Sequence, residues 1–195
     1  MSLYTLALFV HLVGAIVGVG GVCAWLFALI GVGAARTVGQ VRALLALYAL
    51  AGNVALGGVL LIVIGGLYMA LSTSLWQSAW LIVATISFVL VLSAGGAILG
   101  RSIQALSKLA NEAPEGPLSA ALMGQIQDPI TRVALHTYIA VLFGIVFLMT
   151  IKPALVWAIV VILIAAALGV LSGLPLMRTA RTSTSHPDRD EQPVS

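Results

Sequence analysis

Two histidines, one lysine and one asparagine lie in or beside long apolar stretches: His11, His136, Lys152 and Asn53. Ionisable groups inside a membrane-crossing helix are costly, and they often mark functional sites. No carboxylate pair, phosphate-binding loop, Ser-His-Asp set or cysteine metal cluster accompanies them. The sequence therefore assigns no catalytic residue and leaves open whether the protein is an enzyme.

His11 is the most informative of these residues because its helix face continues through Gly14 and Gly18. Glycines one and two turns from a histidine leave room for a flat ring, as in membrane b-type haem sites. On this interpretation His11 is a metal ligand, Gly14 and Gly18 line the cofactor site, and haem b is the candidate cofactor. The alternative is that His11 hydrogen-bonds a neighbouring helix and that the glycines serve helix packing.

Lys152 is expected in the same half of the membrane as His11, where it would neutralise an anionic group. A haem propionate, a quinone oxygen or a lipid headgroup would each suit its charge. The alternative is a lysine that extends from a helix end to the membrane surface. His136 lies about 9 Å from the opposite surface at the helical rise per residue, so we do not expect it to share a haem with His11.

The elements that carry these residues follow from composition. Of the 195 residues, 61% are hydrophobic and 8% are charged, and the mean hydropathy is +1.15. Uncharged apolar stretches of about 18 residues or more are long enough to cross a bilayer as helices. We predict an all-α, polytopic transmembrane bundle over residues 1–177 with five spans, at about 3–35, 43–71, 76–100, 130–151 and 154–174. The remaining residues, 178–195, are polar and predict a disordered cytoplasmic tail.

Local signals support these boundaries. Asp128-Pro129 is a good helix start, and Lys152-Pro153 predicts a tight turn between the last two spans. Within 117–127, apolar residues every four positions predict either a short helix on the membrane surface or an extension of the next span. Small-residue patterns predict helix contacts, and they fall at Gly14 and Gly18, at Gly58 and Gly65, and at Gly96 and Gly100.

Charge predicts the orientation. With five spans, eight of the nine Lys and Arg residues share one side of the membrane, and only Lys152 lies on the other. Basic residues collect on the cytoplasmic side, so we expect the N-terminus outside and the C-terminus inside. The basic residues sit at the ends of apolar runs, which argues against nucleic-acid binding. Cys23 is the only cysteine, so an intrachain disulfide is excluded.

Two motifs carry a resemblance to a known family: HLVGAIVGVGG at 11–21, and LMTIKP at 148–153. They resemble a bacterial integral-membrane family known as domain of unknown function 2269, over about residues 3–153. The resemblance implies a multi-pass protein of the bacterial cytoplasmic (inner) membrane and marks His11 and Lys152. The first motif is also similar in style to the copper-resistance D and membrane protoporphyrinogen oxidase-type proteins, whose span histidines are linked to copper or haem.

The sequence leaves three functions open. The first is a structural or accessory protein in a membrane complex, whose partners are the lipid bilayer and another membrane protein or a second copy. The second is a haem- or quinone-linked redox protein centred on His11. The third is a small permease, which the scarcity of polar groups in the spans disfavours.

Overall fold

The computed structural model describes residues 2–183, with side chains described as far as Leu174. Its elements, in chain order, are α1 (Leu3–Ala34), α2 (Val38–Ser72), the short 3-10 helix η1 (Leu75–Gln77), α3 (Ala79–Leu90), the π-helix η2 (Val91–Gly95), α4 (Gly96–Glu112), α5 (Ala120–Ile126), α6 (Pro129–Ile151) and α7 (Leu155–Ser183). Five helical segments are long and apolar enough to cross a membrane. The predicted all-α bundle with five spans is therefore confirmed.

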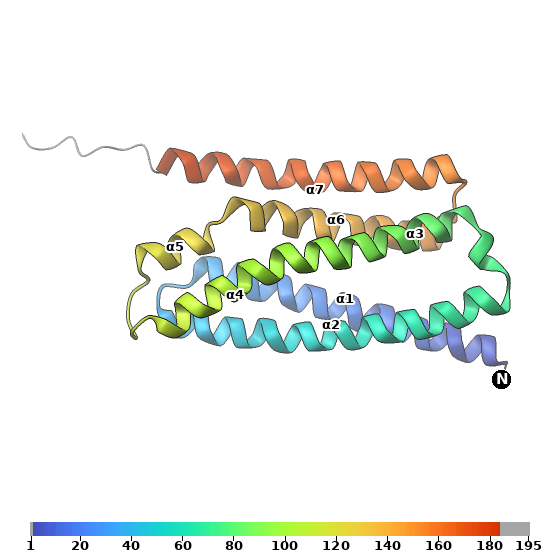
Figure 1. Ribbon diagram of the computed structural model, residues 1–195, viewed down its shortest axis with the longest axis horizontal. Helices are drawn as coiled ribbons and strands as arrows, with labels where there is room; N and C mark the ends of the chain where they lie inside the picture. Colours follow the sequence, from blue (N-terminus) through green and yellow to red (C-terminus); the bar gives the residue numbers. More distant parts are fainter. Residues whose placement is uncertain (1, 184–195) are drawn as a thin grey trace, which may run out of the picture.

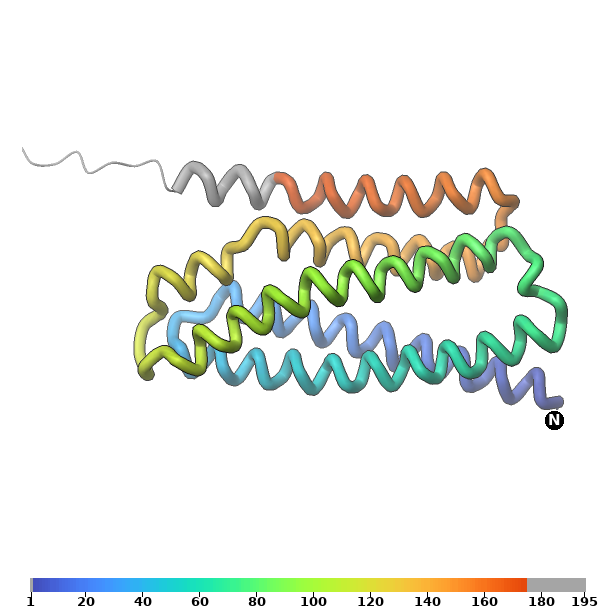
Figure 2. Tube along the Cα trace, viewed as in Figure 1, coloured from blue at the N-terminus to red at the C-terminus, as the bar shows by residue number. Residues whose placement is uncertain are grey.

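The bundle consists of two antiparallel hairpins joined by a diagonal helix (Figure 1). Helices α1 and α2 form one hairpin, and α6 and α7 form the other. The continuous segment α3–η2–α4 crosses between them. Its α3 end packs against α6 and α7, and its α4 end packs against α2, as the path of the chain in Figure 2 also shows. This segment packs against both hairpins and joins them into one bundle.

The helix ends follow local chemistry. The Thr37 side chain accepts the backbone N–H of Gln40, whose side chain returns to the Thr37 backbone in a capping box. This cap starts α2 five residues before the predicted span at 43, so Arg42 lies inside the helix. Asp128 caps α6 by accepting the N–H of Thr131 at 3.0 Å, as predicted. Lys152 ends α6 in the left-handed conformation, with φ 52° and ψ 53°, which makes the predicted turn.

The third span differs from its prediction. The helix continues past Gly100 to Glu112, and the π-helix η2 interrupts it at Val91–Gly95. Its 34 residues from Ala79 to Glu112 span about 51 Å at 1.5 Å per residue, against about 30 Å for the hydrocarbon core. The sequence pattern ended the span at Arg101 because that is where charge begins. The helix instead continues for 12 residues beyond Gly100, as far as Glu112.

That extension contributes to a small core at one end of the bundle, which we call the cap. Val32, Val38, Val41, Leu45, Leu106, Ala110 and Leu122 are buried together there. A short helix does form within 117–127, but it is separate from α6. Leu122 on α5 is 1% exposed and points into the cap core, so α5 packs on protein. The apolar side of this short helix therefore contacts protein, and its position at the membrane surface stays a prediction.

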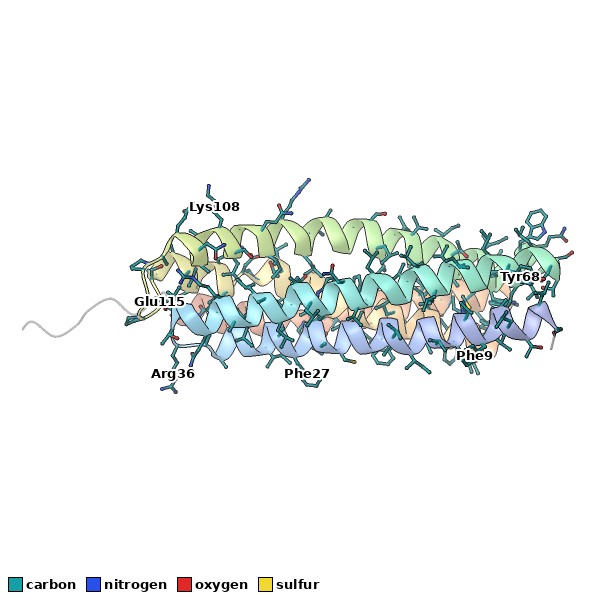
Figure 3. All side chains as sticks on the ribbon, turned by 90° about the horizontal axis from the view of Figure 1, so that it is seen from below. Phe9, Phe27, Arg36, Tyr68, Lys108 and Glu115 are labelled. Atoms are coloured by element: carbon teal, nitrogen blue, oxygen red, sulfur yellow. The ribbon has the colours of Figure 1, made fainter. Side chains whose placement is uncertain are left out.

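The cap stands at one end of the bundle, which we call the basic end. In Figure 3, Arg36, Lys108 and Glu115 lie at this end, and Phe9 and Tyr68 lie towards the other. Of the six Lys and Arg residues up to Leu174, only Lys152 lies at the opposite end. Helix α7 runs to Ser183, beyond the span end predicted at 174. Most of the predicted disordered tail, 178–195, falls outside the described residues, and its disorder stays a prediction.

Candidate functional site

Helices α1 and α2 contact each other through glycines, backbone against backbone. A Cβ atom added to Gly14 would lie 2.6 Å from the backbone nitrogen of Ile62. One added to Gly58 would lie 2.3 Å from the nitrogen of Gly18. Small residues allow this approach in lipid, where no hydrophobic force drives helices together. We call this contact the glycine seam, and it includes Gly21 against Ala55 further along.

His11 lies at one end of the glycine seam and forms a hydrogen bond from α1 to α2. Its Nδ1 is 2.9 Å from the carbonyl oxygen of Ile62 on α2. The ring rests on Gly66, where an added Cβ would lie 3.1 Å from Nδ1. A carbonyl can only accept, so Nδ1 carries the proton and, in the neutral ring, Nε2 keeps its lone pair. His11 therefore makes the interhelical hydrogen bond that one of the two interpretations of the sequence expected.

The face that joins His11, Gly14 and Gly18 does not fit a haem. The structure brings the three residues together as predicted, but α2 occupies the space beside both glycines. Between residues 2 and 183, no group of three or more His, Cys, Asp or Glu side chains could hold a metal ion. The contacts of Gly14 and Gly18 are those of helix packing, and a ligand role for His11 stays a prediction.

Lys152 contacts the diagonal segment, through Trp80 of α3. Its Nζ lies 5.7 Å from the centre of the Trp80 ring, in cation–π range, and its side chain is exposed. Trp80 belongs to α3, whereas His11 bonds to α2. In the described part of the chain no hydrogen bond or ion pair joins Lys152 to His11. The two residues that the family motifs mark therefore have separate partners.

His136 has a local partner. Its Nδ1 lies 2.8 Å from the carbonyl oxygen of Arg132, one turn earlier in α6. The backbone beside it packs against α7, because a Cβ on Gly169 would lie 2.4 Å from the Cα of Thr137. Gly173 makes a similar contact with Val133. Gly169 and Gly173 therefore form a second glycine contact, with a spacing of four residues, between α6 and α7.

The predicted contact at Gly96 and Gly100 is wrong. A Cβ on either glycine would meet no heavy atom within 4 Å among the described residues. The two residues face outward from the diagonal segment, because the side that packs on α6 carries Gly95, where an added Cβ would lie 2.6 Å from Tyr138. A spacing of four alone does not tell which face of a helix is covered.

Three aromatic residues connect the hairpins in the middle of the bundle. Trp25 stacks on Tyr48 with ring centres 4.8 Å apart and planes 9° apart. Its Nε1 donates to the Tyr48 carbonyl oxygen at 3.1 Å. The Trp25 ring also lies 6.2 Å from the ring of Tyr138 on α6. No pattern in the sequence pointed to a contact between these three aromatic residues.

Arg42 forms the main polar contact of the cap. Its guanidinium donates to the carbonyl oxygens of Ala110 at 2.9 Å and Ala113 at 2.7 Å, and it pairs with Glu115. These carbonyls end α4, where a helix leaves acceptors without partners and where positive charge is stabilised. In the sequence, Arg42 is one of the eight basic residues that predict the orientation. Its structural role was hidden because its partners lie about 70 positions further along the chain.

The comparisons with known proteins agree with this picture of a membrane bundle. The family model described as "Predicted integral membrane protein (DUF2269)" matches residues 5–153, from α1 to the end of α6. No curated protein matches the chain, and no solved structure matches it. The similarity to copper-resistance D proteins is not shown by any of these comparisons. Because the family model covers most of the sequence, the chain belongs to this family of predicted integral membrane proteins, and its function is unknown.

Proposed function

We propose that this protein is a structural or accessory membrane protein that acts by assembling with a second copy of itself through the outer face of α2. The observation that supports the proposal is Asn53, an exposed amide on the lipid-facing side of a membrane-crossing helix. An asparagine in this position makes sense when another helix covers it.

The depth of Asn53 makes its exposure costly. It lies 15 residues from Val38 and 19 from Ser72, about 22 Å and 28 Å from the two ends of α2 at the helical rise. Its amide carries two donor hydrogens and two acceptor lone pairs. Hydrocarbon offers them no partner, and each unsatisfied polar group in the bilayer costs free energy. An amide from a neighbouring helix would remove that cost.

The residues around Asn53 permit a close approach. Ala46, Ala49 and Gly57 share its side of α2 and are exposed. An added Cβ on Gly57 would meet no described heavy atom within 4 Å. An asparagine is both donor and acceptor, so two copies related by a two-fold axis can satisfy each other with the same residue. This self-complementarity favours a second copy as the partner.

We also propose the orientation and the location. The charge bias supports an N-terminus outside and a C-terminus inside, with the cap in the cytoplasm. The motifs at 11–21 and 148–153 resemble those of a bacterial family, which supports the bacterial cytoplasmic membrane.

Energy transfer between donor-labelled and acceptor-labelled full-length copies in lipid vesicles tests the assembly. We expect transfer in the wild type that falls as the protein is diluted with lipid. Asn53→Leu should weaken association roughly three- to thirtyfold, because interhelical polar contacts contribute about 0.6–2 kcal/mol. Asn53→Gln should keep most of it.

Thr85→Leu is the matched control, because Thr85 is an exposed polar residue of α3, away from the proposed face. It should associate like the wild type. Transfer that is absent in the wild type at every lipid ratio, or equal in Asn53→Leu and Thr85→Leu, would contradict the proposal.

A further inference from the structure

A groove lies beside the π-helix. Its volume is about 510 Å³, and it lies between the diagonal segment and α6, near the start of α6. Val91, Ala94 and Ile98 line one wall, and Ile130, Val133 and Thr137 line the other. The lining is almost wholly apolar, so a hydrocarbon chain is the ligand that its chemistry fits.

The π-helix shapes the floor of the groove. At Gly95 the diagonal segment approaches α6 so closely that an added Cβ would lie 2.6 Å from the Tyr138 ring. Tyr138 is 8% exposed and packs under this contact. π-Helical turns within α-helices occur frequently at functional sites. Here the turn coincides with the groove, because Val91, Ala94 and Gly95 all belong to η2.

A positive charge stands at the basic end of the groove. Arg101 follows Ile98 by three residues, so it lies on the same face of α4 one turn further along. It is 22 residues from Ala79, about 33 Å along the helix, which is the depth of the headgroups for a core about 30 Å thick.

The charge of Arg101 is available to a ligand. Arg101 is exposed, and the only ion pair in the described part of the chain joins Arg42 to Glu115. Asp128, the acidic residue at the start of α6, accepts the N–H groups of Ile130 and Thr131. Its carboxylate is therefore committed to capping the helix.

We propose that the groove holds an anionic glycerophospholipid, with one acyl chain between η2 and α6 and the phosphate at Arg101. The apolar walls bind the chain by contact, and the arginine selects the charge of the headgroup. The site is distinct from the outer face of α2, so it does not depend on the proposed assembly.

Native mass spectrometry of the full-length protein in detergent, with phosphatidylglycerol or phosphatidylcholine added, tests the site. We expect one retained lipid and a preference for phosphatidylglycerol. Arg101→Gln should reduce that preference about fivefold, because one basic residue near an anionic surface contributes about 1 kcal/mol. Lys108→Gln should not, because Lys108 is exposed two turns further into the cap.

Filling the groove tests the acyl-chain position. Ala94→Phe places a ring in the groove from an exposed position and should lower lipid retention severalfold. Ala97→Phe is its matched control, because Ala97 is also exposed on the same segment and does not line the groove. Ile130→Trp fills the groove from α6, so the result does not rest on the folding of one variant.

No retained lipid in the wild type would overturn the proposal, and so would equal retention by Ala94→Phe, Ile130→Trp and Ala97→Phe. Equal retention of phosphatidylglycerol and phosphatidylcholine by the wild type would overturn the assignment of Arg101 to the headgroup.

Discussion

Trp25 binds Tyr48 in two ways at once, by ring stacking at 4.8 Å and by an Nε1–H bond to the Tyr48 backbone carbonyl at 3.1 Å. The two contacts can be separated by substitution. Trp25→Phe keeps a ring and should cost about 0.6 kcal/mol for the lost interhelical hydrogen bond. Trp25→Leu also loses the stacking, a further 0.5–1.5 kcal/mol or so.

Unfolding in mixed detergent micelles measures both variants. Trp157→Leu is the control, because Trp157 is 66% exposed and should be almost neutral. Equal losses for Trp25→Phe and Trp25→Leu would show that the ring stacking contributes nothing.

Two adjacent glycines of α1 should respond in opposite ways to alanine. A Cβ on Gly21 would lie 2.6 Å from the nitrogen of Ala55, so Gly21→Ala must push α1 and α2 apart and lower the melting temperature. A Cβ on Gly20 meets nothing within 4 Å, so Gly20→Ala should be neutral or stabilising by up to about 1 kcal/mol from helix propensity. Similar melting temperatures for the two variants would mean that the glycine seam is not closed.

Arg42 should stabilise the cap more than its ion pair suggests. Arg42→Ala leaves the end carbonyls of α4 without their donor, at a cost of about 1.5–3 kcal/mol. Glu115→Gln removes only the ion pair, whose carboxylate side chain is 69% exposed, so it should cost less than about 1 kcal/mol.

Limited proteolysis near Pro114 reports on the cap directly. Cleavage should speed up in Arg42→Ala and stay near the wild-type rate in Arg36→Ala, whose exposed side chain lies at the same end. Equal protection in Arg42→Ala and the wild type would show that the guanidinium does not hold the loop.

His11 should behave as a structural residue. His11→Leu removes the hydrogen bond to Ile62 and should cost about 0.6 kcal/mol, the average for such bonds in membranes. The absorption spectrum of wild-type protein expressed with haem and copper supplied tests the other interpretation. A Soret band lost in His11→Leu but kept in His136→Leu would establish His11 as a ligand and contradict this expectation.

Reporter fusions test the orientation. Fusions in the loops at Ser74 and Lys108 should report outside and inside respectively, because basic residues are retained in the cytoplasm. A fusion after Ser195 should report inside. An outside C-terminus would contradict the proposed topology.

The sequence by itself determined the number of spans and several of their ends. Uncharged apolar runs of this length have few alternatives to membrane-crossing helices, because backbone polar groups must be satisfied internally in lipid. The start of α6 at Asp128-Pro129 and its end at Lys152-Pro153 depend on neighbouring residues alone, so both helix ends could be predicted. The helix ends predicted at 43 and 100 were wrong, because charged residues mark where an apolar span ends and a helix can continue past them.

Only the tertiary structure decided which glycines are covered and which polar groups have partners. Gly14 and Gly96 have the same kind of neighbour four residues on, yet α2 covers one and nothing described covers the other. The partners of His11 and Arg42 lie about 50 and 70 positions away, on carbonyls that any residue could supply. Every residue has a backbone carbonyl, so residue types do not identify the acceptor. Such hydrogen bonds can be assigned only from the packing of the helices.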